Sequence, residues 1–154
     1  MITIRKQTPK DARQVKYIKS IVTHELRSIY RPINTENLKD KTAAIHLLAT
    51  LNDKVVGTAE YLLYKDNALV QGLAILPEYR NRGIATKIID YITLKVKAEG
   101  KHELLLSTVK ETGNTELFLK MGFTAHSEEI SNAYKTPLGN KVTIITLKKI
   151  LNNL

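Results

Sequence analysis

The chain has 154 residues, of which 43% are hydrophobic and 25% are charged, so its composition is that of a folded globular protein with a sizeable core. It contains no cysteine, which excludes a disulfide framework, a thiolate nucleophile and a cysteine-ligated metal. No apolar run reaches membrane-spanning length, and residues 1–6 have neither the apolar core nor the cleavage site of a signal peptide. We therefore expect one domain over residues 1–154, located in the cytoplasm and without a membrane partner.

The net charge is +9, and most of the positive excess lies in the first fifty residues. This part of the chain has ten Lys and Arg against four Asp and Glu. An excess of basic residues favours the binding of a polyanionic cofactor, an acidic acceptor or nucleic acid. The sequence has no zinc-finger spacing, aromatic RNA-binding pattern or heptad array. A solvated basic face is therefore favoured, and we do not expect nucleic acid to be the partner.

The first elements along the chain are a strand and an amphipathic helix. Residues 2–7 predict the strand. The helix begins at Thr8, which has Asp11 three residues later as in a capping box, and it ends before Pro32. A polar stretch over 35–41 predicts a short second helix. The apolar face of the long helix has spacings of three and four residues and consists of Val15, Ile18, Val22, Leu26 and Ile29.

The rest of the chain predicts a three-stranded meander followed by two further helices and three further strands. The meander strands are 44–51, 54–64 and 68–76, each separated from the next by turn residues. A long helix with an isoleucine-rich stripe begins at Ile84 and stops at Gly100. After it the sequence predicts a strand over 104–109, a helix over 114–121, and strands over 123–134 and 141–149.

The turn between the third meander strand and the long helix has the chemistry of a pyrophosphate site. It contains Arg80, Arg82 and Gly83 directly before the first helical residue, Ile84. The first N–H groups of a helix have no partner inside the helix and carry partial positive charge. Gly83 allows close approach of a ligand to the backbone, and arginine forks fit phosphate oxygens. No G-x-x-x-x-G-K-[ST] or G-x-G-x-x-G run is present, which excludes the common nucleotide loops.

The segment R-N-R-G-I-A, preceded by L-A-I-L-P-E-Y, resembles the acyl-CoA signature Q/R-x-x-G-x-G/A of the GCN5-related N-acetyltransferase (GNAT) family. Arg80, Gly83 and Ala85 fill the first, fourth and sixth positions. The predicted order β-α-(α)-β-β-β-α-β-α-β-β is also that of the family, over nearly the whole chain. The resemblance implies a mixed α/β fold in which two central parallel strands, here 68–76 and 103–109, splay apart.

The resemblance also implies acetyl-CoA as the co-substrate and assigns residues to it. The pantetheine arm is expected on the backbone of Leu73, Ala74 and Ile75. A second match, T-G-N followed by F-L-K-M-G-F, implies that Asn114 contacts the cofactor. An equally good interpretation of Asn114 is that its side chain caps the N-terminus of the following helix. Phe118 is expected to pack against the cofactor. The pyrophosphate is expected on Arg80, Asn81, Arg82, Gly83, Ile84, Ala85 and Thr86.

Two positions depart from the family pattern. Phe118 stands where many members have a tyrosine that protonates the leaving thiolate, and Leu69 stands where several have a glutamate base. We therefore consider Glu60 and Gln71 as residues that orient a water near the acyl carbon. Counting with a period of two places Glu60 on one face with Val56, Thr58 and Leu62, and Gln71 on one face with Leu69 and Leu73. The alternative is that Glu60 is simply a strand residue whose side chain faces solvent.

Other catalytic groups are less favoured by the sequence. Tyr61, Tyr64 and Tyr134 are candidate proton donors, although most buried tyrosines only pack with a hydrogen-bonded tip. The four histidines are scattered and have no metal-ligand spacing, so we expect no metal.

The sequence thus predicts an acetyl-CoA-dependent N-acetyltransferase that acts on a primary amine of a small molecule or peptide. The amine attacks the thioester directly in a ternary complex, since no covalent nucleophile is apparent. The resemblance places the acceptor site in the segments 24–40 and 126–140, and a homodimer is one expected state because dimers are frequent in the family. The alternatives are a non-catalytic acyl-CoA sensor, suggested by Phe118 and Leu69, and a basic nucleic-acid-binding domain.

Overall fold

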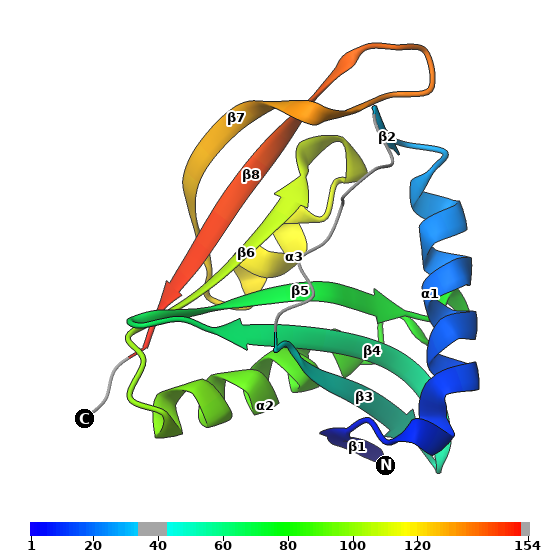
Figure 1. The fold of residues 1–154 in the computed structure, drawn as a ribbon, viewed down its shortest axis with the longest axis vertical. Helices are drawn as coiled ribbons and strands as arrows, with labels where there is room; N and C mark the ends of the chain where they lie inside the picture. Colours follow the sequence, from blue (N-terminus) through cyan, green and yellow to red (C-terminus); the bar gives the residue numbers. More distant parts are fainter. Residues whose placement is uncertain (34–42, 152–154) are drawn as a thin grey trace.

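The structure is a computed structural model that describes residues 1–33 and 43–151. The chain forms one eight-stranded mixed sheet with helices packed against it (Figure 1). This is the mixed α/β fold that the sequence predicts; the expected short helix over 35–41 lies outside the described residues. The helices are α1 (Ala12–Leu26), α2 (Ile84–Ala98) and α3 (Thr115–Lys120). The strands are β1 (Ile2–Lys6), β2 (Arg31–Pro32), β3 (Ile45–Leu51), β4 (Lys54–Leu63), β5 (Asn67–Ile75), β6 (Glu103–Val109), β7 (Thr124–Lys135) and β8 (Lys141–Ile150).

The sheet opens between its two parallel strands. Its order is β1-β3-β4-β5-β6-β8-β7-β2, and all neighbours are antiparallel except β5 and β6. Those two strands pair only at their starts, residues 67–69 with 103–105. Beyond this point they diverge and leave a wedge between β5 and the β6–β8–β7 part of the sheet (Figure 1). The expected splay of the central strands is therefore confirmed.

The two long helices bury their apolar stripes on opposite faces of the sheet. Consecutive residues of β5 show this, because Ala74 packs with α1 and Ile75 packs with α2. The α1 cluster is the smaller of the two and includes Ile18 and Val22. The stripe expected on the long helix is fully buried in the main core, at Ile84, Ile88, Ile89, Ile92 and Val96.

Two irregularities in the meander change which residues share a face. The β3–β4 register shifts beside Val56, and the β4–β5 register shifts beside Gly72, which has a φ of +64°. Each shift adds one residue to a strand, which reverses the alternation of side chains beyond it. The expectation that Glu60 shares a face with Val56 is therefore wrong, since Val56 packs in the α2 core. The same holds for Gln71 and Leu73, because Leu73 also packs on the α2 side.

The segment after α1 crosses to the far part of the sheet. α1 ends at Leu26, earlier than expected, and the two residues of β2 then pair with residues 134–135 of β7. The ring of Tyr30 contacts Tyr134 edge to face at 5.2 Å between centroids. This link was not predicted, because a two-residue strand has no periodicity to read. It joins α1 to the β7–β8 hairpin across the open side of the wedge (Figure 1).

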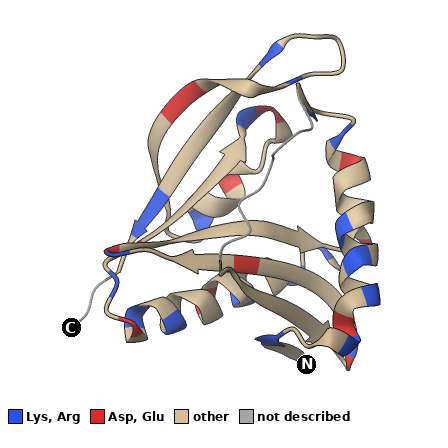
Figure 2. Ribbon diagram, in the orientation of Figure 1, with Lys and Arg blue, Asp and Glu red and all other residues tan. Residues whose placement is uncertain are grey.

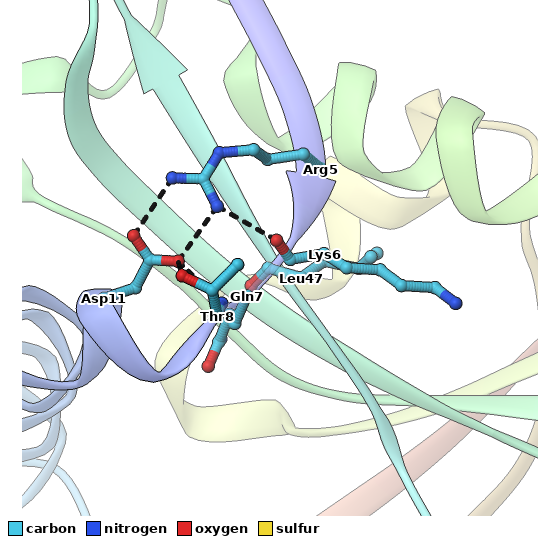
Figure 3. A network of polar contacts seen from close by, with 6 residues as sticks. All are labelled: Arg5, Lys6, Gln7, Thr8, Asp11 and Leu47. Atoms are coloured by element: carbon cyan, nitrogen blue, oxygen red, sulfur yellow. Dashed lines mark hydrogen bonds and ion pairs between the residues drawn. The ribbon is translucent and has the colours of Figure 1, made fainter.

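A polar network fixes the start of α1 to β1. The guanidinium of Arg5 donates to both carboxylate oxygens of Asp11, at 2.9 and 3.0 Å, and the backbone N–H of Thr8 donates to Asp11 at 2.7 Å (Figure 3). The hydrogen bond from Arg5 is the main cause that holds the pKa of Asp11 well below its usual range. The predicted helix start at Thr8 is thus confirmed, with Asp11 reaching back to the Thr8 N–H.

Candidate functional site

The turn before α2 presents a row of unpaired backbone donors. A 3₁₀ turn over Pro77–Tyr79 leads into Asn81 and Gly83, whose φ angles are +63° and +80°. Within the described part of the chain, the backbone N–H groups of residues 81–86 make no hydrogen bond, and no side chain caps α2. When residues in the left-handed conformation alternate with residues in other conformations, successive N–H groups point into one concavity of the backbone. Such a concavity binds anions. The backbone therefore has the form expected for a pyrophosphate cradle.

A cavity of about 560 Å³ begins at this turn and continues into the wedge. It lies between α1, the end of β5, the turn, and α3. Among the residues expected to hold the cofactor, only Arg82 does not line it. The lining comprises Val22, Glu25, Leu26, Ile29, Leu73, Ala74, Ile75, Tyr79, Arg80, Asn81, Gly83, Ile84, Ala85, Thr86, Thr112, Asn114, Leu117 and Phe118.

The two arginines of the turn are arranged differently from the expectation of two phosphate forks. Arg80 forms a bidentate ion pair with Glu25 of α1, at 2.7 and 2.8 Å, and its Nε–H donates to the carbonyl of Ile75. The hydrogen bond from Arg80 lowers the pKa of Glu25. Arg82 stacks over the ring of Tyr79 at 5.3 Å. Arg80 thus keeps two of its five N–H donors for a ligand while it joins the turn to α1.

The second family segment lies on the opposite wall of the cavity. Asn114 precedes α3, and its side chain makes no capping hydrogen bond. Its backbone N–H instead donates to the hydroxyl of Thr112 at 3.2 Å. Phe118 is buried, with its ring edge to face with Phe123 at 6.2 Å between centroids. Asn114 therefore has a side chain available in the cavity, and Phe118 contributes apolar surface without a donor.

The structure brings Glu60 and Gln71 together, outside the cavity lining and on the α1 face of the sheet. Gln71 Nε2 donates to Glu60 Oε1 at 2.6 Å. Glu60 Oε2 lies 3.0 Å from His46 Nδ1 and 3.7 Å from Lys19 Nζ. The side chain of Glu60 is 16% exposed, so it is not a simple solvent-facing residue.

Sequence reasoning missed His46 and Lys19 as partners of Glu60. The two-residue turn at Asn52 and Asp53 fixes the hairpin, and uninterrupted pairing from it would place His46 opposite Ala59. The bulge at Val56 moves the register by one residue and places Glu60 opposite His46 instead. No local signal in the sequence marks this shift.

The tyrosines considered as proton donors do not line the cavity. Tyr61 is buried on the α2 side, and burial raises its pKa. Tyr64 is half exposed, and Tyr134 contacts Tyr30. Tyr79 is the tyrosine that does line the cavity.

The segments expected to form the acceptor site meet at one end of the molecule. Ile33 N–H donates to the carbonyl of Ala133, and Arg27 stacks over Tyr30 at 5.1 Å. The Lys and Arg residues of α1 lie in its first half, away from this end, and Glu25 lies in its last turn (Figure 2). The two segments are therefore in contact through their backbones.

Residues 1–33 and 43–151 contain no group of three or more His, Cys, Asp or Glu side chains that could hold a metal ion. In the same residues no helix is both long enough and apolar enough to cross a membrane.

The chain is similar to known proteins in sequence and in structure. The model of the acetyltransferase (GNAT) domain matches residues 42–125. No curated protein sequence matched the chain. The ribosomal-protein-S18-alanine N-acetyltransferase from Escherichia coli superposes with a TM-score of 0.75 at 16% identity, covering 99% of this chain and 95% of that chain. The protein smu.2055 from Streptococcus mutans UA159 superposes with a TM-score of 0.79 at 19% identity, covering 97% of this chain and 99% of that chain.

A third similar structure, from Bacillus anthracis str. Ames, was solved in complex with acetyl coenzyme A. It gives a TM-score of 0.74 at 14% identity and covers 99% of both chains. At such identities these structures show the fold alone, whereas the domain match spans more than half of the sequence. The chain therefore belongs to the GNAT family of acetyltransferases, the enzymes that transfer an acetyl group from acetyl-CoA.

Proposed function

We propose that the protein transfers the acetyl group of acetyl-CoA to a primary amine of a small molecule or peptide, by direct attack in a ternary complex. The observation that carries this proposal is the row of unpaired N–H groups over residues 81–86, which faces a cavity that continues into the wedge. We place the enzyme in the cytoplasm and expect a homodimer.

The cavity fits an extended molecule with a phosphate group at one end. The pyrophosphate accepts hydrogen bonds from the turn and from the two remaining N–H donors of Arg80. The pantetheine arm runs along residues 73–75, where β5 has left β6 and its backbone is not paired with that strand. Asn114 and Phe118 cover it from the side of α3. The Bacillus anthracis structure supports acetyl-CoA as a ligand of this fold.

The protein accelerates the reaction mainly by positioning. The amine nitrogen attacks the thioester carbonyl, the C–N bond forms, and the C–S bond breaks to release the thiolate of CoA. Phe118 cannot donate a proton to that thiolate, so water does. Glu60 and Gln71, beside the wedge, orient a water near the acyl carbon. Holding the two reactants together is worth several kcal/mol, which is enough for a good acyl donor.

The test is CoA release from acetyl-CoA with a panel of amines, together with calorimetry of CoA binding. A transferase gives CoA release that depends on the amine and on enzyme concentration. A sensor module binds CoA and releases no thiol with any amine. A protein that does not bind CoA at all contradicts the proposed site.

A further inference from the structure

An ion pair joins two walls of the cavity at its phosphate end. Glu25 lies in the last turn of α1, Arg80 lies in the turn before α2, and both line the cavity. Two parallel hydrogen bonds of 2.8 and 2.7 Å connect the guanidinium to the carboxylate. The side chains are 37% and 45% exposed, so a ligand in the cavity can reach both. Arg80 thus holds a carboxylate at the place where a phosphate is expected to bind.

This pair removes the net charge from the cavity wall. Among the described residues that line the cavity, only Glu25 and Arg80 carry a charge. Arg82, the other arginine of the turn, stacks over Tyr79 and does not line the cavity. The lining side chains therefore sum to zero charge, although the expected ligand carries phosphates at this end.

Arg80 does not need Glu25 to stay beside the turn. Its Nε–H donates to the backbone carbonyl of Ile75, at the end of β5, at 3.1 Å. This bond anchors the guanidinium next to the N–H groups of residues 81–86 whether or not a carboxylate is present. The main effect of Glu25 on a ligand is therefore electrostatic.

The electrostatic effect opposes the binding of a phosphate. An unpaired guanidinium offers its full charge and up to four more N–H donors after the bond to Ile75, whereas the paired one offers two. Charge-assisted hydrogen bonds are the strong ones, so sharing the guanidinium weakens its grip on a second anion. The carboxylate of Glu25 also repels a phosphate directly.

A weaker phosphate site is useful in a transferase, because the pyrophosphate is the same in acetyl-CoA and in the product CoA. Binding energy at this end is equal before, during and after the reaction, so it does not raise kcat. A tight grip there delays the departure of CoA.

Resting on the proposed function, we propose that Glu25 competes with the pyrophosphate for Arg80 and thereby weakens CoA binding and speeds the release of product CoA. Glu25 acts through Arg80 and takes no part in the bond changes. It sets the affinity of the enzyme for its cofactor from the opposite wall of the cavity.

The experiment is calorimetry of CoA binding to the wild type, Glu25→Gln, Arg80→Gln and the double variant. Glutamine keeps the size of glutamate without its charge, so Glu25→Gln should bind CoA about five- to tenfold more tightly. Arg80→Gln should weaken CoA binding more in the Glu25→Gln background than in the wild type, because Glu25 no longer occupies the guanidinium. The matched control is Glu99→Gln, the same charge change at the far end of α2, about 22 Å along the helix. It should bind CoA as the wild type does.

Steady-state kinetics locate the effect at the phosphate end. In Glu25→Gln, KM for acetyl-CoA and the inhibition constant of product CoA should both fall by about the factor seen in calorimetry. S-acetylpantetheine lacks the pyrophosphate, so its kcat/KM should be the same for Glu25→Gln and the wild type.

Two results would overturn this inference. Weaker CoA binding in folded Glu25→Gln would mean that the carboxylate only orients Arg80 for the phosphate. Equal tightening with and without Arg80 would mean that Glu25 does not act through this arginine. Either result leaves the transferase proposal standing, whereas a wild type that binds no CoA defeats the proposed function itself.

Discussion

At the residue scale, Gly83 decides whether the turn before α2 can hold a phosphate. Its φ of +80° suits glycine, and apart from its two chain neighbours no residue lies within 4 Å of where a Cβ would be. Gly83→Asp would therefore place a charged group freely into the cradle. A unit charge about 4 Å from a phosphate charge costs about 4 kcal/mol near a protein surface, so CoA binding should be lost.

Gly83→Asn is the matched control, because asparagine has the same size and tolerates the left-handed conformation. It should weaken CoA binding far less than Gly83→Asp does. Calorimetry on both folded variants measures the difference. Unchanged CoA affinity in Gly83→Asp would refute the site.

Phe118 tests whether the enzyme lacks a proton donor for the thiolate. The ring lines the cavity and is buried, so a hydroxyl added in Phe118→Tyr would lie near the cofactor. Since water protonates the thiolate in our mechanism, kcat should change little. General acids contribute about 10²–10⁴-fold. A gain of that size in a steady-state assay would show that positioning alone does not explain the rate.

At the scale of elements, the bulge of β5 depends on Gly72. An alanine there must keep a φ of +64°, and its Cβ would lie 3.4 Å from Cγ of Glu60. The left-handed conformation costs about 1–2 kcal/mol for a residue with a side chain. We expect Gly72→Ala to lose about this much stability and, in addition, to lower kcat by displacing Glu60.

Gly100→Ala separates these two effects. Gly100 has a φ of +78° just after α2, outside the proposed acceptor segments, with open space around its Cβ position. It should show a similar loss of stability in urea unfolding and normal kcat. Equal kcat values for the two variants would mean that the bulge does not position Glu60 for the reaction.

The junction of β1 and α1 should make stability depend on pH. The folded state holds the pKa of Asp11 below its ordinary value of 3.8. The carboxylate therefore contributes stability above about pH 4, and this contribution is lost as the pH falls further. Asp11→Asn should lower the unfolding midpoint at pH 7, and the difference from wild type should shrink at pH 3. Asp90→Asn, on the exposed side of α2, should show neither effect.

At the scale of the whole molecule, the two arginines that follow α1 are positioned to attract an anionic acceptor. Arg27 and Arg31 follow the helix, beside the link between β2 and β7. Reversing both to Glu should raise KM for an acceptor with carboxylates or phosphates and leave KM for acetyl-CoA nearly unchanged. Added salt should lower the wild-type rate with such acceptors, since screening acts over about 10 Å at ~0.1 M.

The control for this prediction is Lys95→Glu combined with Lys97→Glu, in the last turn of α2. It makes the same change in net charge far from the junction of α1 and β7 (Figure 1). An equal rise of KM in both double variants would show that net charge, and not a local entrance, governs the approach. If polyamines prove to be the best substrates, the proposal that these arginines attract an anionic acceptor is contradicted as well.

The sequence by itself determined the parts that depend on neighbours along the chain. The stripe of α2 follows from a period of 3.6 residues, and the helix start at Thr8 follows from capping over three residues. The cradle was predictable for the same reason, because Gly83 and the first N–H groups of α2 belong to one local turn. The pair of central parallel strands, residues 68–76 and 103–109, followed from the resemblance to the family.

Only the tertiary structure decided which distant residues meet. The pair of Arg80 with Glu25 joins residues 55 positions apart, and nothing local marks it. The row of His46, Glu60 and Gln71 depends on two one-residue register shifts. A register shift of one residue moves the side chains beyond it to the opposite face of the sheet. The stability of the shifted register depends on the packing of α1 and α2 on the completed sheet. The unpaired N–H groups before α2 are thus encoded locally, whereas the row of His46, Glu60 and Gln71 exists only in the folded sheet.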